Sequence, residues 1–437
     1  MLLTDPFFHS EIDNRFSDSA LIGQWLRIEV ALAAVQAESG LIDADVVKQI
    51  ETAVADFEPD MPSLQMAMEK SGVPIAELVR QMRGHVGAPA GDFIHFGATT
   101  QDIIDTGMVI QLKSCFVDVL MPTLRRLIDA LARLTETHRE TVMAGRTHSQ
   151  QAVLLTFGLK AANWLAPLIR QYQSFSDDWA EVQLGGAAGT LAPLGNQGIV
   201  VKTRLAEELG LSAGSSVWHT QRDRLAALAS WLSVTTGALA KMGQDVILMS
   251  QSEIGELFES ADPTRGGSST MPQKRNPMVS EALVAIHRSN VGHLSSLHQA
   301  LVHEHERATG SWQVEWLVLA RMVSHTAAAL EKGAWLAENL VVNTEKIERN
   351  LKRSNGMMLA EAASFMLAEH MSRKEAKTAV KNGIETATKE DRHLIDVLSE
   401  QLSTLPIDWA MLKDEKNHLG VTHQLIDQIV AESKTLE

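Results

Sequence analysis

The sequence is poor in cysteine and tyrosine, with one residue of each among 437. A lone cysteine, Cys115, cannot form an internal disulfide, and it excludes a zinc cluster built from cysteines. This composition fits a protein of a reducing, cytoplasmic setting. The alternating, β-branched runs that mark strands are also nearly absent, so the chain is predicted to be all-α.

Long apolar runs and an excess of basic charge are missing as well. No stretch is purely apolar over the roughly 18 residues that a bilayer span needs, and the N-terminus lacks the features of a signal peptide. We expect a soluble chain with no membrane partner. The sequence has 39 Lys and Arg against 54 Asp and Glu, which gives a net charge of -15. This negative charge opposes binding to nucleic acid. A small anionic substrate can still bind in a local basic pocket.

Apolar residues do recur at steps of three and four, which is the period of a helix. One such segment begins at a capping residue, Ser17 or Asp18, and ends at Gly40. Longer segments run over about residues 105–141, with a kink expected at Pro122, and about residues 220–257. Helices of roughly 35 residues reach about 50 Å. They must bury their apolar faces against one another, so we predict a central long-helix bundle.

Three helical domains are expected from these patterns. Residues 1–104 would form an N-terminal helical domain, and residues 105–348 the long-helix bundle that carries the catalytic loop. After about Asn350 the helical pattern shortens and becomes more charged. Residues 349–437 are therefore predicted to form a small helical C-terminal domain.

The most specific motif is the string GSSTMPQKRNP at residues 267–277. A diglycine hinge leads into two hydroxyls, a lysine and an asparagine, and the string ends in a proline suited to starting a helix. Such a loop can close over a substrate, where Lys274 and backbone N–H groups would stabilise developing negative charge. A short GSS alone usually marks a surface loop with a helix cap, but the whole string is far more specific.

This string resembles the signature of the fumarase/aspartase superfamily, which includes argininosuccinate lyase, adenylosuccinate lyase and carboxymuconate cycloisomerase. In that family the first serine of the pair is the base that takes the proton beside the substrate carboxylate. The resemblance implies this role for Ser268. Other residues of the string would bind the substrate carboxylate and its aci-anion: Ser269, Met271, Lys274 and Asn276.

A second block, HFGATTQDIIDT at residues 95–106, also resembles a signature of the superfamily. It lies where the family order requires it. The resemblance implies that Thr99, Thr100 and Gln101 bind a substrate carboxylate.

The third block, GRTHSQQA at residues 145–152, implies Thr147 as a binding residue and His148 as a catalytic group. A lone histidine is more often structural than catalytic, so the neighbouring match carries this inference. Glu281 lies where adenylosuccinate lyases place the carboxylate that orients this histidine. A carboxylate partner favours the protonated imidazole and so a proton donor. The alternative for Glu281 is a solvated helix residue.

Three more strings resemble the 3-carboxy-cis,cis-muconate cycloisomerase branch most closely, over almost the whole chain. They are QLGGAAGTLAPLG from Gln183, WHTQRDRL from Trp218 and HEHERATGSWQVEW from His303. Further substrate-binding candidates come from them, with ordinary salt bridges as the alternative: Gln221, Arg222 and Arg307.

Two functions stay open. The chain lacks the His-Asp-Val block and the N-terminal Arg-Tyr of adenylosuccinate lyases, which disfavours a nucleotide substrate. Cycloisomerases commonly have a bulky apolar residue in place of His148, because a lactone oxygen leaves as a stable carboxylate and needs no acid. A departing amine does need a proton donor. The alternative to a cycloisomerase is therefore an iminodisuccinate-type epimerase or a C–N lyase on an N-substituted aspartate.

No cofactor or metal is implied, because the sequence has no HExxH motif, no cysteine pair and no GxGxxG after a strand. The resemblance implies a homotetramer with active sites shared between subunits, acting on a small polycarboxylate. The candidate residues occur together, which favours an enzyme over a non-catalytic protein on the same scaffold.

Overall fold

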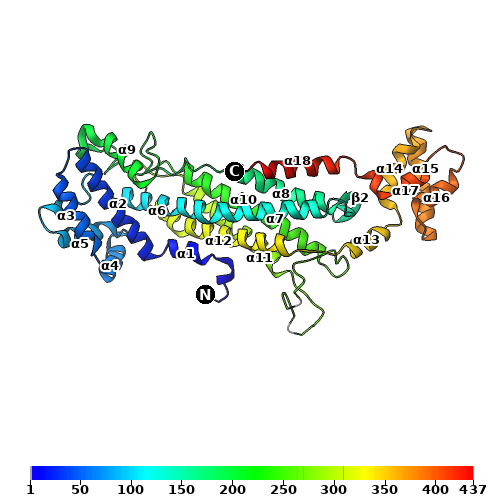
Figure 1. The fold of residues 1–437 in the computed structure, drawn as a ribbon, viewed down its shortest axis with the longest axis horizontal. Coiled ribbons are helices and arrows are strands. Elements are labelled where there is room, and N and C mark those ends of the chain that lie inside the picture. The colour runs from blue at the N-terminus through cyan, green and yellow to red at the C-terminus, as the bar shows by residue number, and fades with distance from the viewer. Residues whose placement is uncertain (1, 263, 269, 309, 437) are drawn as a thin grey trace. The chain divides into compact units, whose positions relative to one another are not determined.

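The computed structural model describes residues 2–262, 264–268, 270–308 and 310–436. Its elements are almost all helices, and the all-α prediction is confirmed (Figure 1). The chain forms two compact units. The first unit contains Met1–Pro122, Phe175–Val234 and Arg288–Ala328, and the second contains Thr123–Ser174, Thr235–His287 and Ala329–Glu437.

The first unit is built from short and medium helices around one apolar core. Of the two predicted caps, Ser17 is the one that caps the longest of these helices, because its Oγ accepts the N–H of Ala20 at 3.4 Å. The core includes Leu32, Leu78 and Ile103, which come from three different helices and are at most 1% exposed. The helices are α1 (Ser10–Arg15), α2 (Asp18–Glu38), α3 (Ala44–Ala55), α4 (Met61–Ser71), α5 (Ile75–Val86), α6 (Thr100–Cys115) and α9 (Gly198–Leu209), with short turns η1 (Asp5–Phe7), η2 (Ala90–Phe93) and η4 (Ala192–Gln197).

In place of the single helix predicted over residues 105–141, the structure has α6 followed by α7 (Met121–Thr137), with a helical turn between them. The disturbance expected at Pro122 takes the form of a π-helical turn, η3 (Phe116–Leu120). Proline has no N–H for the carbonyl four residues earlier, and a widened turn accommodates that loss.

Three long helices contribute residues to both units: α10 (Asp223–Met249), α11 (Met278–Gln299) and α12 (Ser311–Asn339). With 27 residues, α10 is shorter than the segment 220–257 predicted. The chain leaves the helical path after Met249 and turns at Gly255, whose φ is 59°. Among the described residues, α10 is the one helix long and apolar enough to cross a membrane, and 61% of its most apolar window is buried, as in a core helix.

A β-hairpin that the sequence did not predict belongs to the second unit. Strands β1 (Val142–Thr147) and β2 (Gln150–Thr156) pair antiparallel, with an irregularity between Ala144 and Arg146. The turn residues His148 and Ser149 have φ of 49° and 63°, as a two-residue hairpin turn requires. The alternation of side chains along these short strands was too brief to be distinguished from a helical pattern. The third signature block lies in this hairpin.

Helices complete the second unit. Ala144 and Leu154 of the hairpin pack in a core with Leu367 and Leu398 from the C-terminal helices. These elements are α8 (Phe157–Gln173), α13 (Thr344–Lys352), η5 (Met357–Leu359), α14 (Ala360–Leu367), α15 (Arg373–Glu390), α16 (Leu394–Gln401), α17 (Trp409–Lys413), η6 (Glu415–His418) and α18 (Thr422–Lys434), with the short strands β3 (Leu257–Phe258) and β4 (Val341–Val342). The domain boundaries at residues 104 and 348 stay a prediction.

We expect His325 on α12 to make the stability of the first unit dependent on pH. Burial and the neighbouring His293 and Arg321 lower the pKa of His325 to about 4, while Phe8 packs on its ring at 4.6 Å. An unfolded histidine titrates near pH 6.5, so the unfolded chain binds more protons between about pH 6.5 and 4. The free energy of unfolding should therefore fall as the pH drops through this window.

We expect His325→Asn to lose part of this decline, measured by denaturant unfolding at about pH 4.5 and about pH 7. His305→Asn is the control, because His305 is exposed and its positive φ tolerates asparagine. An equal decline in all three proteins would contradict the assignment.

Candidate active site

The loop that carries Ser268 is closed at its base by the chain itself. Gly267 and Arg275 form an antiparallel bridge, and the N–H of Asn276 donates to the carbonyl of Gly266 at 2.7 Å. Gly266 has a φ of 68°, and an added Cβ would lie 2.2 Å from the carbonyl oxygen of Asn276. Only glycine fits this close approach, so one glycine of the predicted hinge is required by the loop base.

Ser268 already has donors directed at its hydroxyl. Its Oγ accepts the backbone N–H of Thr270 at 3.3 Å and that of Met271 at 3.1 Å. Two such donors stabilise negative charge on the oxygen, which a serine acting as a base requires. Ser269, the second predicted serine, lies outside the described residues.

The remaining loop candidates differ in exposure. Met271 and Lys274 are exposed, while Asn276 is half-buried and lines a small pocket with Arg265 and Arg275. The guanidinium of Arg265 stacks over the Trp335 ring, 4.1 Å from its centroid. The sequence prediction missed both arginines, although Arg265 lies two residues before the signature string and Arg275 lies inside it. They place positive charge at the loop of an otherwise acidic chain, as a polycarboxylate site needs.

Helix α11 begins directly after the loop and is held by Glu259. Its carboxylate accepts the N–H of Ser280 at 2.6 Å, the hydroxyl of Ser280 at 2.7 Å and the N–H of Val279 at 3.2 Å. This capping fixes where the loop ends. Glu281 lies in the first turn of α11 and is exposed. Among the described residues no hydrogen bond joins Glu281 to His148, so their pairing stays a prediction.

Thr147 and His148 lie exposed at the tip of the β1–β2 hairpin. Just below the tip, Arg146 donates to both carboxylate oxygens of Glu256, at 2.8 and 2.6 Å. Glu256 is 1% exposed and also accepts the Asn350 side-chain N–H at 2.9 Å. This buried ion pair holds the hairpin in the second unit and gives His148 a defined position. The sequence prediction passed over Arg146, although it lies inside the third block.

The first signature block is organised by Asp102, which the sequence prediction also missed. Its buried carboxylate accepts the N–H groups of Thr99 at 3.0 Å, Gly185 at 2.9 Å and Gly186 at 2.9 Å. The Nε2 of His219 lies 2.7 Å from the same carboxylate. Asp102 thus joins the first block to the glycine-rich string and to the WHTQR string. Its sequence signal is the capping-box spacing, three residues after Thr99.

The structure brings Thr99 and Arg307 together from distant parts of the sequence. The Nη1 of Arg307 donates to Thr99 Oγ1 at 2.9 Å, and its Nη2 donates to the Ala187 carbonyl at 2.9 Å. Thr100 follows as the first residue of α6 and is half-buried. These three candidates therefore lie in one place in the first unit.

Arg222 is buried, and its guanidinium donates hydrogen bonds to two carboxylates and a backbone carbonyl. Its Nε donates to Glu315 at 2.7 Å, its Nη1 to Asp105 at 2.8 Å and to the Trp218 carbonyl at 3.3 Å, and its Nη2 to both carboxylates. All five N–H groups of the guanidinium are thereby occupied, which leaves none for a substrate in this structure. We therefore treat Arg222 as a structural residue. Gln101, 0% exposed, supports it by donating to Asp105 at 3.1 Å.

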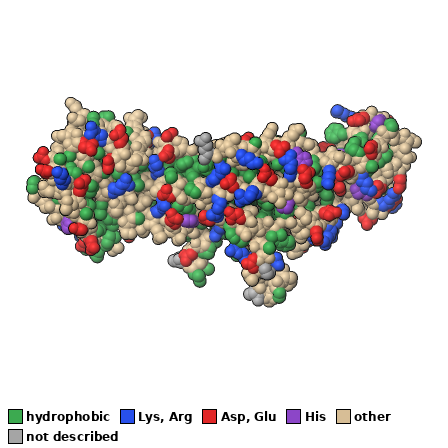
Figure 2. Space-filling model, viewed as in Figure 1, with side chains coloured by type: hydrophobic (Ala, Val, Ile, Leu, Met, Phe, Trp, Pro, Cys, Tyr) green, Lys and Arg blue, Asp and Glu red, His purple; other side chains and the backbone are tan. Residues whose placement is uncertain are grey.

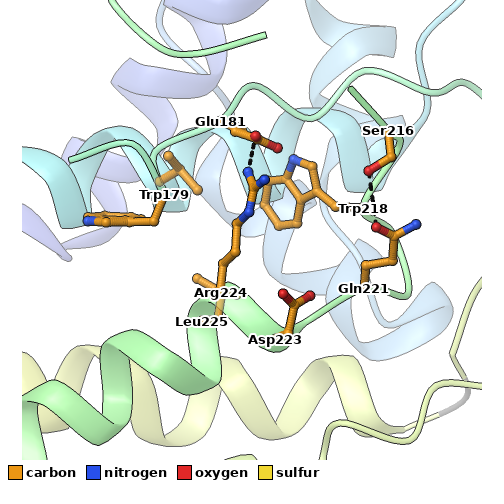
Figure 3. A pocket seen from close by; sticks show the side chains of 9 residues that line it. Trp179, Glu181, Ser216, Trp218, Gln221, Asp223, Arg224 and Leu225 are labelled. Atoms are coloured by element: carbon orange, nitrogen blue, oxygen red, sulfur yellow. Dashed lines mark hydrogen bonds and ion pairs between the residues drawn. The ribbon is translucent and has the colours of Figure 1, made fainter. Parts of the chain in front are cut away.

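Gln221 lines a pocket of about 70 Å³ in the first unit (Figure 3). Its side-chain oxygen accepts the Ser216 hydroxyl at 3.0 Å. Across the pocket Arg224 forms an ion pair with Glu181. Among the described residues, no other predicted site residue lines this pocket, which makes it a poor candidate for the catalytic centre.

Apart from Gln101, Gln221 and Arg222, the candidates fall into three groups. Thr99, Thr100 and Arg307 lie in the first unit, whereas the hairpin tip and the Ser268 loop belong to the second. Acidic and basic side chains are interspersed over the visible surface in Figure 2. Within the described part of the chain, no group of three or more His, Cys, Asp or Glu could hold a metal ion.

Residues 4–292 match the family model described as lyase. The chain belongs to the fumarase/aspartase superfamily. It is therefore an enzyme of that superfamily, as the three signature blocks predicted.

Its similarity to individual members extends over nearly the whole chain. The 3-carboxy-cis,cis-muconate cycloisomerase of Pseudomonas aeruginosa is 39% identical, and the alignment covers 96% of this chain and 94% of that protein. Trans-aconitate decarboxylase 1 of Mycosarcoma maydis is 36% identical over 98% of this chain and 88% of its own. The crystal structure of the 3-carboxy-cis,cis-muconate lactonizing enzyme of Pseudomonas putida matches with a TM-score of 0.92 and 35% identity, covering 100% of this chain and 99% of its own. The predicted fumarase/aspartase fold is confirmed.

Proposed function

We propose that the enzyme is a cycloisomerase that converts 3-carboxy-cis,cis-muconate into a lactone through an aci-carboxylate carbanion. The observation that carries this proposal is the 39% identity to a cycloisomerase over 96% of the chain. A relative named as a decarboxylase is 36% identical, so the reaction itself has to be tested.

In the proposed reaction, one carboxylate oxygen of the substrate adds to an alkene carbon. The electron pair of the double bond moves to the carbon beside a second carboxylate and forms the aci-anion. Ser268 then gives its hydroxyl proton to that carbon, and the N–H groups of Thr270 and Met271 stabilise the alkoxide that remains. The groups proposed to hold the aci-carboxylate are Thr100, Ser269, Lys274 and Asn276. No cofactor takes part.

We infer a homotetramer of the cell's reducing interior, with active sites shared between subunits. Large apolar side chains stand exposed on the long helices, including Val234, Val291 and Leu317 at 53%, 47% and 62% exposure. Subunit contacts would cover such residues. In the second unit, no hydrogen bond among the described residues joins the hairpin tip to the Ser268 loop, which fits a site completed by another chain.

The function is tested by assaying 3-carboxy-cis,cis-muconate, iminodisuccinate and adenylosuccinate in parallel. We expect lactone formation from the first, followed as loss of the diene absorbance, and no turnover of the third. Turnover of iminodisuccinate alone would overturn the cycloisomerase proposal in favour of the second candidate.

That second candidate is an epimerase or C–N lyase on an N-substituted aspartate. His148 favours it, because an exposed imidazole on a fixed hairpin tip is suited to protonating a departing nitrogen. Glu281 would orient and charge this histidine across the shared site.

The variant His148→Asn separates the two candidates. Asparagine keeps the positive φ of the turn but cannot act as a proton donor of similar strength. If lactone formation is the reaction, kcat should change by less than about threefold, whereas an amine substrate would lose about 10²–10⁴-fold. Steady-state kinetics on each substrate measure this. Ser149→Asn, at the neighbouring turn position, controls for damage to the hairpin, and a large loss on the muconate would contradict a lactonisation that needs no acid.

A further inference from the structure

The side chain of His303 is buried, at 0% exposure. Among the described residues, neither of its ring nitrogens makes a hydrogen bond of normal geometry. A buried polar group left unpaired is costly, so such a group calls for an explanation. His303 lies on the loop between α11 and α12, four residues before Arg307.

The imidazole borders the buried cluster around Arg222. His303 Nε2 lies 3.9 Å from Glu315 Oε1, the oxygen that accepts the Arg222 Nε–H. On the other side of the guanidinium, Asp105 also accepts the Trp312 indole N–H at 2.8 Å. The charged groups that face His303 are thus Asp105 from α6, Arg222 from the segment before α10 and Glu315 from α12, with Glu304 on its own loop.

The charges of this cluster balance only with one additional proton. Two carboxylates, Asp105 and Glu315, face one guanidinium, and a buried uncompensated charge is strongly destabilising. Burial raises the pKa of Glu315, against the opposing effect of Arg222. Burial and then Arg222 lower the pKa of His303. The additional proton therefore belongs on the Glu315 carboxyl, with a neutral His303 imidazole 3.9 Å away.

The cluster also supports two segments proposed to bind substrate. Gln101 of the first signature block donates to Asp105, and Arg307 on the His303 loop donates to Thr99. A displacement of His303 would shift the loop and weaken the contact between Arg307 and Thr99.

We propose that His303 is a positioning residue, whose buried neutral imidazole lies beside the protonated Glu315 carboxyl and so anchors the loop that places Arg307 against Thr99. The catalytic part of this inference rests on the proposed function, because it takes Thr99 and Arg307 to bind a substrate carboxylate. The structural part, the anchoring of the loop, is independent of the substrate.

The test compares His303→Phe, which removes both ring nitrogens, with His303→Gln, which keeps a side-chain N–H. We expect His303→Phe to raise the KM for 3-carboxy-cis,cis-muconate about tenfold with kcat changed less than about threefold. His303→Gln should restore most of the KM. His305→Asn, an exposed histidine of the same loop, should match the wild type. A wild-type KM in His303→Phe would overturn the catalytic part.

A second measurement needs no substrate. Trypsin cleavage after Arg307 in the native full-length enzyme, followed by mass spectrometry, should be about tenfold faster in His303→Phe, because cleavage requires the loop to open. An unchanged rate would overturn the anchoring. A faster rate in a protein that does not turn over the muconate would support the anchoring and reject the proposed function.

Glu315→Gln provides an independent variant if His303→Phe does not fold. Glutamine mimics the protonated carboxyl, so it should keep the loop closed and the cleavage rate close to that of the wild type. Cleavage about tenfold faster in Glu315→Gln would overturn the assignment of the proton to Glu315.

Discussion

Ser268→Ala is expected to lower kcat by about 10²–10⁴-fold on whichever substrate the enzyme accepts. The alanine removes the oxygen to which Thr270 and Met271 donate their N–H groups, and no other group in the loop replaces it as the proposed base. Steady-state kinetics give the activity, and circular dichroism with size-exclusion chromatography should show an unchanged fold and assembly.

Thr264→Ala is the matched control for this experiment. Thr264 is an exposed hydroxyl residue at the start of the same loop, and its Oγ1 donates to Asp262 at 2.7 Å. We expect kcat within about twofold of the wild type, because the hydroxyl stabilises only the local turn. Near-normal activity in Ser268→Ala would remove the central residue of the mechanism.

Arg222→Met is expected to destabilise the protein by about 3–5 kcal/mol. Methionine fills part of the volume but leaves the carboxylates of Asp105 and Glu315 buried without their cation. The change should appear as a large fall in the melting temperature followed by circular dichroism. Activity should fall only to the extent that folded protein is lost, since Arg222 has no N–H left for a substrate.

Arg204→Met is the control for a lost surface pair. Arg204 contacts Glu38 at 2.9 Å, but the two side chains are 42% and 60% exposed, so the pair contributes at most about 1 kcal/mol. Combining Arg222→Met with Asp105→Asn and Glu315→Gln should recover much of the loss, because the buried charges are removed together. A melting temperature in Arg222→Met equal to that of Arg204→Met would show that the cluster is not structural.

The local sequence pattern was sufficient to predict the fold class and most of the helices. The Ser17 cap and the helix after it follow from a capping residue and a run of apolar positions, both of which act over a few residues. The hairpin that carries His148 was not predicted. Its strands are short, and their pairing depends on the two-residue turn and on Arg146 reaching Glu256, 110 residues away.

By itself the sequence determined the superfamily, the all-α architecture and the nomination of Ser268, because these rest on contiguous strings and periodicities. Only the tertiary structure decided that Arg222 is enclosed by Asp105 and Glu315, residues 117 and 93 positions away. It also showed that Asp102 joins three strings, and that His303 is buried beside Glu315. The physical reason is that the role of a charged side chain depends on its burial and its partners, and distant segments supply both.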